Sequence, residues 1–442
     1  MKGHVRKRGK TWYYQFRLPE KGPDGSEPTE TKGGFATEKA AWEACRIAMA
    51  AVEGGKHVKK TKTTVKSFLL EWLPAIEMIV DATTYDNWQA LAKAYAIPRL
   101  GATELQKLTT PMLMKFYAQL LTDGRIKPDN NMRMYEFWVK ATSRGREPTP
   151  AQVVTACGVT IHAARAAVRR FKDGRIPTPK PAGLAPKTVR NIHVMLHRAF
   201  TDAVAWKYVV DNPAEKAKPP RVPRSKRPVW TPEQAAAFMN SIRYDRFYAL
   251  YLLELSTGLR RAEICGIRWP SLDLDTGVLS VHEGRVVVAG RAQDAQVKTD
   301  DSARMIALDT ATVTVLKQWK AVQDAERPLY GDDYKKTGLV FTWEDGSAVH
   351  PDTVRERFKR LAARAELPEI RFYDLRHTYV TGALTAGVSP KVVSQRVGHA
   401  DVAFTMKTYQ HVLPGQDEDA AARAATHLLG GHHEQRGTSH DG

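Results

Sequence analysis

A short basic segment rich in proline divides this sequence into two parts. Residues 215–227 contain three prolines and six Lys or Arg residues against one Glu. Proline and repelling charges both favour an extended chain, so this composition predicts a positively charged linker. Immediately after it, Thr231 and Pro232 have the residue types of a helix N-cap and first helical position. The sequence therefore predicts a linker over residues 213–229, with separate folded units before and after it.

The length and the charge of the chain set the broad class. By the usual length prior, 442 residues correspond to about three domains, and 43% hydrophobic residues suffice for ordinary packed cores. A formal net charge of +19 predicts attraction to a polyanion, most commonly nucleic acid, although a merely basic protein would show the same excess. Cys45, Cys157 and Cys265 are too far apart in sequence for a zinc motif or a disulfide framework.

Nothing in the sequence predicts a membrane protein. The N-terminus has no apolar stretch of the signal-peptide kind, and the strongest apolar run, residues 247–253, is far too short to span a bilayer. We therefore expect a cytoplasmic protein.

Two units precede the linker. Residues 1–55 predict a small β-sheet followed by a helix, with strand aromatics at residues 12–16 beside basic residues. This arrangement suits a sheet that contacts DNA, but a plain mini-domain with an aromatic core explains it too. Residues 65–212 follow a helical pattern, interrupted by a long segment at about 122–183.

Inside that segment, residues 148–172 predict two helices around a turn that contains Gly158. Its second helix carries several basic residues, as a helix-turn-helix would. A helical hairpin with a solvated basic face explains the pattern equally, and we favour it because helix-turn-helix signals are weak in one sequence.

Four short strings in the last two-fifths of the chain carry the chemistry. They are Ser256–Glu263, Gln296–Thr299, Tyr373–Thr378, and Val397–His399 followed by Lys407–Tyr409. Arginine forks can bind two phosphate oxygens, lysine can give a proton to a leaving oxygen, and a tyrosine can attack phosphorus. Together the strings offer cations and donors for one phosphate and a nucleophile for it.

In this order, the strings resemble the active-site set of the tyrosine recombinases, the phage integrase family. The resemblance covers roughly 370 of the 442 residues and extends to an arm-type DNA-binding domain and a helical core-binding domain. It implies two phosphate-binding arginines, a general-acid lysine, a phosphate-donating histidine and a tyrosine nucleophile, with a supporting carboxylate. By position these are Arg260 and Arg376, Lys298, His399, Tyr409 and Glu263.

The chain departs from the family pattern at Tyr373. The family usually has a histidine three residues before the second arginine. A tyrosine hydroxyl can donate a hydrogen bond to phosphate, but it cannot act as an imidazolium. His377, next to Arg376, would point elsewhere on a helix, so we predict a structural role for it.

The resemblance implies a multidomain α+β chain. Its parts would be an arm-binding domain at 1–55, a SAM-like core-binding domain at 65–212, a mainly helical catalytic domain with a small sheet at 230–430, and a disordered tail at 431–442. It further implies DNA-contacting basic residues in the linkers and at one helix start. We assign these as Lys59, Lys60, Lys187, Arg190, Arg221, Arg224, Lys226 and Arg227.

The implied activity is that of an integrase of a phage or integrative plasmid, of the actinobacterial type. It would cut and rejoin double-stranded attachment sites as a homotetramer on two DNA sites, through a 3′-phosphotyrosine, with neither ATP nor metal. An excision factor or a host DNA-bending protein is a candidate accessory partner. A type IB topoisomerase, or a DNA-binding regulator whose active site is impaired by Tyr373, remains an alternative.

Overall fold

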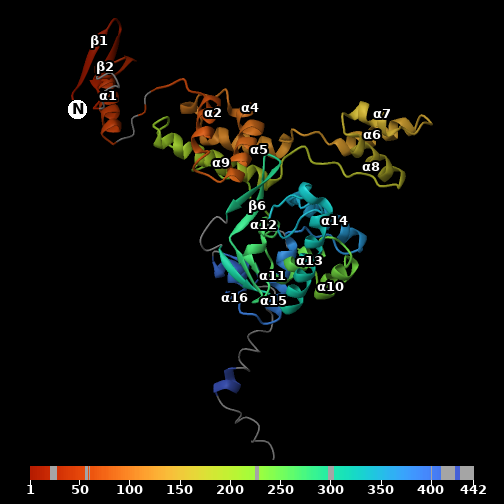
Figure 1. The fold of residues 1–442 in the computed structure, drawn as a ribbon. Coiled ribbons are helices and arrows are strands. Elements are labelled where there is room, and N and C mark those ends of the chain that lie inside the picture. The colour runs from red at the N-terminus through yellow and green to blue at the C-terminus, as the bar shows by residue number, and fades with distance from the viewer. Residues whose placement is uncertain are drawn as a thin grey trace, which may run out of the picture. The chain divides into compact units, whose positions relative to one another are not determined.

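The structure is a computed structural model that separates into two compact units, residues 1–223 and 224–442 (Figure 1). It describes residues 1–19, 27–54, 58, 60–223, 228–296, 303–399, 401–409 and 424–428. The predicted disordered tail lies outside the described residues.

The chain begins with a three-stranded antiparallel sheet backed by one helix. The strands β1 (Gly3–Arg8), β2 (Thr11–Arg17) and β3 (Thr29–Phe35) pair in sequence order, and α1 (Glu38–Glu53) follows. Side chains alternate across a strand, so Tyr14 and Phe16 of β2 share the inner face and are buried with Cys45 of α1. Thr37 caps α1 by accepting a hydrogen bond from the Ala40 amide.

A helical bundle follows. Its elements are α2 (Val65–Ile76), α3 (Ala82–Leu91), the π-helix η1 (Ala92–Ala96), α4 (Ile97–Leu100), the 3₁₀ turn η2 (Leu105–Lys107), α5 (Thr110–Asp123) and α9 (Pro186–Ala205). Phe68, Trp72, Phe116 and Phe200 are buried in its core. The Trp72 indole also donates to the Asp202 carboxylate at 2.8 Å, which joins α2 to α9.

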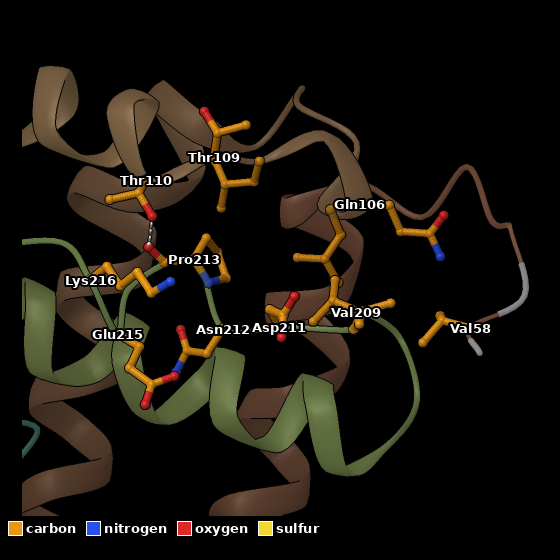
Figure 2. A pocket seen from close by; sticks show the side chains of 13 residues that line it. Val58, Gln106, Thr109, Thr110, Val209, Asp211, Asn212, Pro213, Glu215 and Lys216 are labelled. Carbon is orange, nitrogen blue, oxygen red and sulfur yellow. Dashed lines mark hydrogen bonds between the residues drawn. The ribbon is translucent and has the colours of Figure 1, made fainter. Parts of the chain in front are cut away.

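The segment after α9 folds back onto this bundle (Figure 2). Beside a cavity of about 520 Å³, the Thr110 hydroxyl donates to the Pro213 carbonyl at 2.8 Å. Ala214 and Ala217 are buried in the core of the bundle. The structure thus differs from the extended linker predicted from residue 213, because the chain up to Ala217 packs against the helices.

Between α5 and α9 lie three further helices with a hydrophobic core of their own. They are α6 (Asn130–Thr142), α7 (Pro150–Cys157) and α8 (Ile161–Lys172), shown in yellow in Figure 1. No single helix in the described ranges is long and apolar enough to cross a membrane. Only α7 and α8 pass that test as a pair, and they are bent by 115°.

The second unit is mainly helical. Its helices and turns are α10 (Pro232–Ser241), α11 (Tyr248–Thr257), α12 (Arg261–Gly266), η3 (Trp269–Ser271), α13 (Thr310–Tyr330), η5 (Gly331–Asp333), α14 (Pro351–Arg364), α15 (Asp374–Thr385), α16 (Pro390–Val397) and α17 (Val402–Tyr409). Its strands are β4 (Leu272–Asp273), β5 (Val278–Val281), β6 (Glu283–Val288), β7 (Arg291–Gln296) and β8 (Arg304–Ala307). The strands form one antiparallel sheet, β4-β5-β8, and one hairpin, β6-β7.

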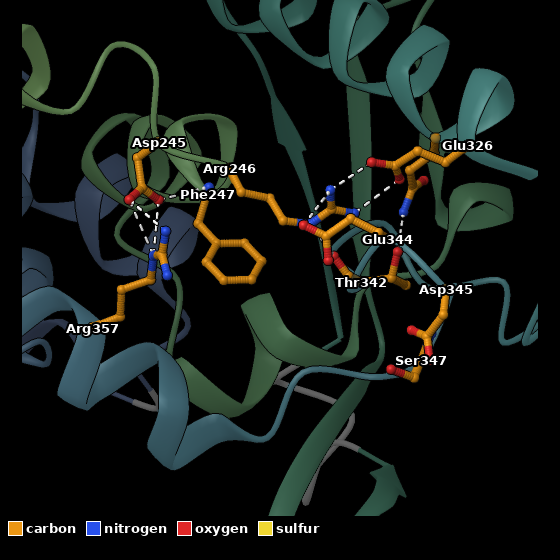
Figure 3. Close-up of polar contacts among 10 residues, drawn as sticks. Asp245, Arg246, Phe247, Glu326, Thr342, Glu344, Asp345, Ser347 and Arg357 are labelled. Carbon is orange, nitrogen blue, oxygen red and sulfur yellow. Dashed lines mark hydrogen bonds and ion pairs between the residues drawn. The ribbon is translucent and has the colours of Figure 1, made fainter. Parts of the chain in front are cut away.

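Two bidentate ion pairs hold the loop between α10 and α11 (Figure 3). Arg357 of α14 binds both carboxylate oxygens of Asp245, and Arg246 binds both oxygens of Glu326 on α13 at 2.6 and 2.9 Å. Phe247, between the two arginines in sequence and space, is fully buried. Because both pairs are largely shielded from water, they fix the start of α11 relative to α13 and α14.

Candidate active site

A left-handed glycine places the first candidate arginine. Helix α11 ends at Gly258, whose φ is +65°, and Arg260 then becomes the N-cap residue of α12. The Arg260 amide donates to Glu263 at 2.8 Å, and the Arg260 guanidinium donates to the same carboxylate at 2.7 Å. The sequence Gly-Leu-Arg therefore turns the chain sharply and holds the arginine against its own helix.

Glu263 is clasped by a second arginine that the sequence analysis did not select. Arg304, at the start of β8, donates to both Glu263 oxygens at 3.1 and 2.9 Å. Burial opposes ionisation of Glu263, but the hydrogen bonds from Arg304 and Arg260 outweigh it and lower the pKa of the carboxyl. Glu263 thus stays charged and orients both guanidinium groups.

The second candidate arginine is buried deeper. Arg376, in the first turn of α15, is only 1% exposed and donates to the Gly258 carbonyl at 2.7 Å. Burial and the nearby charge of Arg260 lower its pKa to about 10. Its Nη2 atom has no hydrogen-bond partner within the described residues. A buried guanidinium donor without an acceptor is costly, so the site is prepared for an anionic oxygen.

The candidate histidine follows a second left-handed glycine. Gly398, with φ +68°, ends α16, and its carbonyl accepts a hydrogen bond from Arg260. A Cβ atom on Gly398 would lie 2.9 Å from Nη1 of Arg304 and 3.3 Å from Nη1 of Arg260. Glycine is therefore required both by the backbone conformation and by the close approach of the arginines.

His399 itself is held by Thr405, whose hydroxyl lies 2.7 Å from Nδ1. Burial, Arg376 and Arg260 together lower its pKa to about 4, so the imidazole is neutral at physiological pH. A neutral imidazole can still donate one hydrogen bond to phosphate from Nε2 when Nδ1 accepts from Thr405. We call Arg260, Glu263, Arg304 and Arg376 the arginine cluster; His399 borders it.

The candidate nucleophile lies in a small apolar pocket. Tyr409 ends α17 and is buried with Val380, Val393 and Val397 of α15 and α16. Its hydroxyl is hydrogen-bonded to Nδ1 of His377. His377 was predicted to have a structural role because it leaves α15 on a different side from Arg376. The structure shows that this side faces Tyr409.

Tyr373 occupies a more open position. It is 42% exposed, and its ring packs edge-on against the His377 imidazole with 5.3 Å between centroids. In the described residues its hydroxyl has no hydrogen-bond partner in the protein, so it can bind a ligand at the surface.

A fully buried carboxyl group, that of Glu254, lies near Arg376 and Glu263. Glu254 of α11 has no hydrogen-bond partner within the described ranges, and burial raises its pKa well above the ordinary value despite the nearby Arg376. The neutral acid is therefore favoured. Sequence reasoning missed Glu254 and Arg304, because their neighbours in the fold do not belong to a local motif.

The remaining predicted residues divide into two groups. Lys298, Lys59, Arg224, Lys226 and Arg227 lie outside the described residues. Lys60, Lys187, Arg190 and Arg221 are exposed. Lys187 and Arg190 lie on consecutive turns at the start of α9.

Residues 229–416 match the model of the phage integrase family, and residues 4–50 match that of an Arm DNA-binding domain. The chain carries a phage integrase family domain. This phage integrase domain contains the whole arginine cluster, His399 and Tyr409.

Two relatives with established names align with part of the chain. The tyrosine recombinase XerC-like protein of Caldanaerobacter subterraneus subsp. tengcongensis is 28% identical over 257 residues, which is 54% of this chain and 66% of the relative. The ICEBs1 integrase of Bacillus subtilis is 26% identical over 241 residues, 54% of this chain and 65% of the relative. The chain thus spans slightly less than two-thirds of each relative's length.

A similar fold is also found in a solved structure. The Tn1549 transposon integrase, in complex with a circular intermediate DNA, superposes with a TM-score of 0.59 at 18% identity, covering 82% of this chain and 100% of that one. The predicted fold class, a small sheet-plus-helix domain, a helical domain and a mainly helical catalytic domain, is confirmed.

Proposed function

We propose that the protein is a site-specific DNA recombinase, an integrase that cuts and rejoins double-stranded attachment sites through a 3′-phosphotyrosine. The observation that carries this proposal is the buried Arg376, whose Nη2 donor lacks an acceptor within the described residues and lies near the charge of Arg260 and the His399 imidazole. A phosphodiester oxygen supplies the missing acceptor. The match to the phage integrase family and the names of the relatives support the same activity.

In this mechanism the arginine cluster neutralises the phosphate. Arg260 and Arg376 bind its non-bridging oxygens, Glu263 holds Arg260 in place and is itself held by Arg304, and His399 adds a neutral donor. The pentacoordinate phosphorus carries more negative charge than the ground state, so fixed donors stabilise it selectively. Tyr373 reaches the phosphate as a further hydroxyl donor.

The reaction exchanges one ester for another. The Tyr409 oxygen attacks phosphorus, and the phenol proton passes to His377, which already accepts a hydrogen bond from that hydroxyl in one tautomer. The bond to the 5′-oxygen breaks, and Lys298 gives that oxygen a proton. The 5′-hydroxyl of a second strand then attacks the phosphotyrosine and releases Tyr409. Because each step conserves the ester bond, no ATP hydrolysis is required.

Exchange between two DNA sites requires four protomers, so we propose a homotetramer that acts on one pair of strands at a time. Lys60, Lys187, Arg190 and Arg221 are exposed cations available for DNA phosphates, and Lys59, Arg224, Lys226 and Arg227 are proposed to extend this set. An excision factor or a DNA-bending protein is the proposed accessory partner.

A covalent adduct tests this proposal. The protein is mixed with DNA from the region that flanks its own gene and resolved on a denaturing gel, beside Tyr409→Phe and the control Tyr244→Phe. Tyr244 is 89% exposed. We expect an adduct with the wild type and with Tyr244→Phe that is absent with Tyr409→Phe.

Tight specific binding without any adduct would contradict the proposal and indicate a regulator. A covalent adduct with relaxation of supercoiled DNA, but without strand exchange between two DNA sites, would instead indicate a topoisomerase.

A further inference from the structure

The segment between α5 and α9 leaves the helical bundle and returns to it at one point. The Arg125 amide donates to the Ala182 carbonyl at 2.7 Å, and the Arg125 side chain donates to the Pro181 carbonyl at 2.6 Å. Next to these bonds along the chain, the Lys180 amide donates to the Asp129 carboxylate at 2.8 Å. These bonds close the base of the segment, so residues 126–180 form an insertion whose ends are held side by side.

The insertion has its own hydrophobic core. Phe171 of α8 packs against Tyr135 and Trp138 of α6, with ring centroids 5.2 and 5.9 Å apart. Val153 of α7 and Ala167 of α8 are fully buried in the same cluster. Three helices around a separate core form a folding unit.

Helices α7 and α8 form a sharp turn. The Thr149–Gln152 capping box starts α7, and Gly158, with φ +62°, ends it. Thr160 then caps α8 by accepting from the Ala163 amide at 3.3 Å. The two helices are bent by 115°, and a three-residue turn containing glycine joins them. Helix-turn-helix units have helices at about 90–120° and a turn of this length.

One face of α8 lies outside the insertion core, although Arg170 at its edge donates to the Asn131 side chain of α6 at 3.3 Å. His162, Arg165, Ala166, Arg169 and Arg170 are exposed and recur at helical spacing, and we call them the α8 face. In the parts of the chain that the structure describes, neither Arg165 nor Arg169 has a carboxylate partner. Lys172, by contrast, pairs with Glu147 at 2.5 Å. The central Ala166 has a short side chain, so a ligand can approach the helix closely.

The charge of the insertion favours a polyanion as that ligand. Residues 125–183 contain twelve Lys or Arg residues against four Asp or Glu. The major groove of DNA is about 12 Å wide and admits one α-helix, with phosphates on both rims. A basic face on the second helix of a helix-turn-helix unit is complementary to that groove in shape and in charge.

We propose that α6–α8 are an inserted helix-turn-helix module that binds duplex DNA through the α8 face. This interaction is additional to those of the arm domain and of the arginine cluster. It does not depend on phosphotyrosine chemistry, because a module with its own core binds DNA whether or not Tyr409 reacts.

The test measures affinity, not cleavage. Binding of the full-length protein to a labelled duplex of arbitrary sequence, about four helical turns long, is followed by fluorescence anisotropy over a range of salt concentrations. Arg165→Ala/Arg169→Ala should weaken binding about tenfold. It should also lower the log–log salt slope by about two, because each phosphate that a cation neutralises contributes about 0.9 to that slope.

Two further variants make the outcome specific. Lys140→Ala/Arg144→Ala removes the same charge from exposed positions at the end of α6 and should weaken binding less than about threefold, the part due to net charge alone. Ala166→Glu adds a carboxylate at the centre of the α8 face, keeps a good helix former, and should weaken binding as much as the double arginine variant.

Equal effects of the α6 and α8 variants on affinity, or no effect of the α8 variants, would overturn the proposal. If the wild-type protein forms no adduct, but the α8 variants bind DNA more weakly than the α6 variant does, only the recombinase proposal is refuted.

Discussion

The arginine cluster and the α8 face use the same side chain in opposite ways. In the cluster, Arg376 is buried, and Arg304 is 7% exposed and shares Glu263 with Arg260. On the α8 face, Arg165 and Arg169 are exposed and have no carboxylate to orient them within the described structure. Buried, paired guanidinium groups define the position of one phosphate, whereas exposed ones follow a line of phosphates.

This difference separates rate from affinity. Exposed charges are screened by salt within about 10 Å at about 0.1 M ionic strength, while buried charges are screened much less. Mutations in the cluster should therefore change the chemical step, and mutations on the α8 face should change how tightly DNA is held.

The largest expected effect is on the cleavage rate of Arg376→Met. Removal of one preorganised donor to a developing oxyanion costs about 10²- to 10³-fold in rate, so single-turnover cleavage at saturating DNA should fall by that factor. Binding to the same duplex, measured by anisotropy, should weaken far less than the rate, because Arg376 contacts only one of the phosphates that the protein binds.

Arg165→Ala/Arg169→Ala is the matched comparison and should show the reverse, weaker binding with an unchanged rate at saturation. An Arg376 variant that binds DNA less tightly yet cleaves normally would break the distinction between the two regions.

Stability sharpens the same comparison. Glu263→Gln removes the buried carboxylate that Arg304 and Arg260 share, and should lower the free energy of unfolding of the C-terminal unit by about 3 kcal/mol in urea denaturation. Glu147→Gln breaks the exposed Lys172 pair with the same chemical change and should cost less than about 1 kcal/mol. If the two variants are destabilised by a similar amount, the buried carboxylate of Glu263 contributes no more to stability than the exposed carboxylate of Glu147.

A separate, pH-dependent effect concerns the proton of Tyr409. His377→Gln keeps a hydrogen-bonding side chain but cannot accept a proton, so the cleavage rate should fall about 10²-fold, as for removal of a general base. The deficit should narrow as pH rises toward the ordinary tyrosine pKa of about 10, since the phenol then ionises without help.

The control for His377→Gln is His282→Gln, at an exposed position of the same unit, which should cleave DNA at the wild-type rate. A deficit that stays constant across pH would show that His377 only positions the ring of Tyr409.

Sequence strings located Arg260, Glu263, Arg376, His399 and Tyr409 because the local backbone places them. Arg260 and His399 each follow a left-handed glycine at a helix end, and such turns have a sequence signature. Glu263 is three residues after Arg260, the spacing of a capping box.

The sequence predicts a structural role for His377, but it does not identify the neighbour of its side chain. Neighbouring residues on a helix point about 100° apart, which sends one to solvent only when the helix lies at a surface. The first turn of α15 is buried on all sides, so His377 meets Tyr409 instead. Arg304 was not found from the sequence for a similar reason. The alternation of side chains along β8 predicts which face of the strand Arg304 occupies, but not that Glu263 lies against that face.

In the insertion, the sequence predicted the local motif but not the core that the motif joins. Its two helices and turn were predicted from glycine and cap residues, but the third helix that packs against them was not. The aromatic pair Tyr135 and Trp138 that completes the core lies in α6, outside the motif that predicted the two helices.

The unfilled donor of Arg376 also links DNA occupancy to the lifetime of the protein. Anything that binds only the folded state stabilises it, by about 2.7 kcal/mol at a concentration about one hundred times the dissociation constant. A phosphate that satisfies Nη2 removes a desolvation penalty that the free protein carries. Protein bound to DNA should therefore resist proteolysis longer than unbound protein, which unfolds more often and is degraded first.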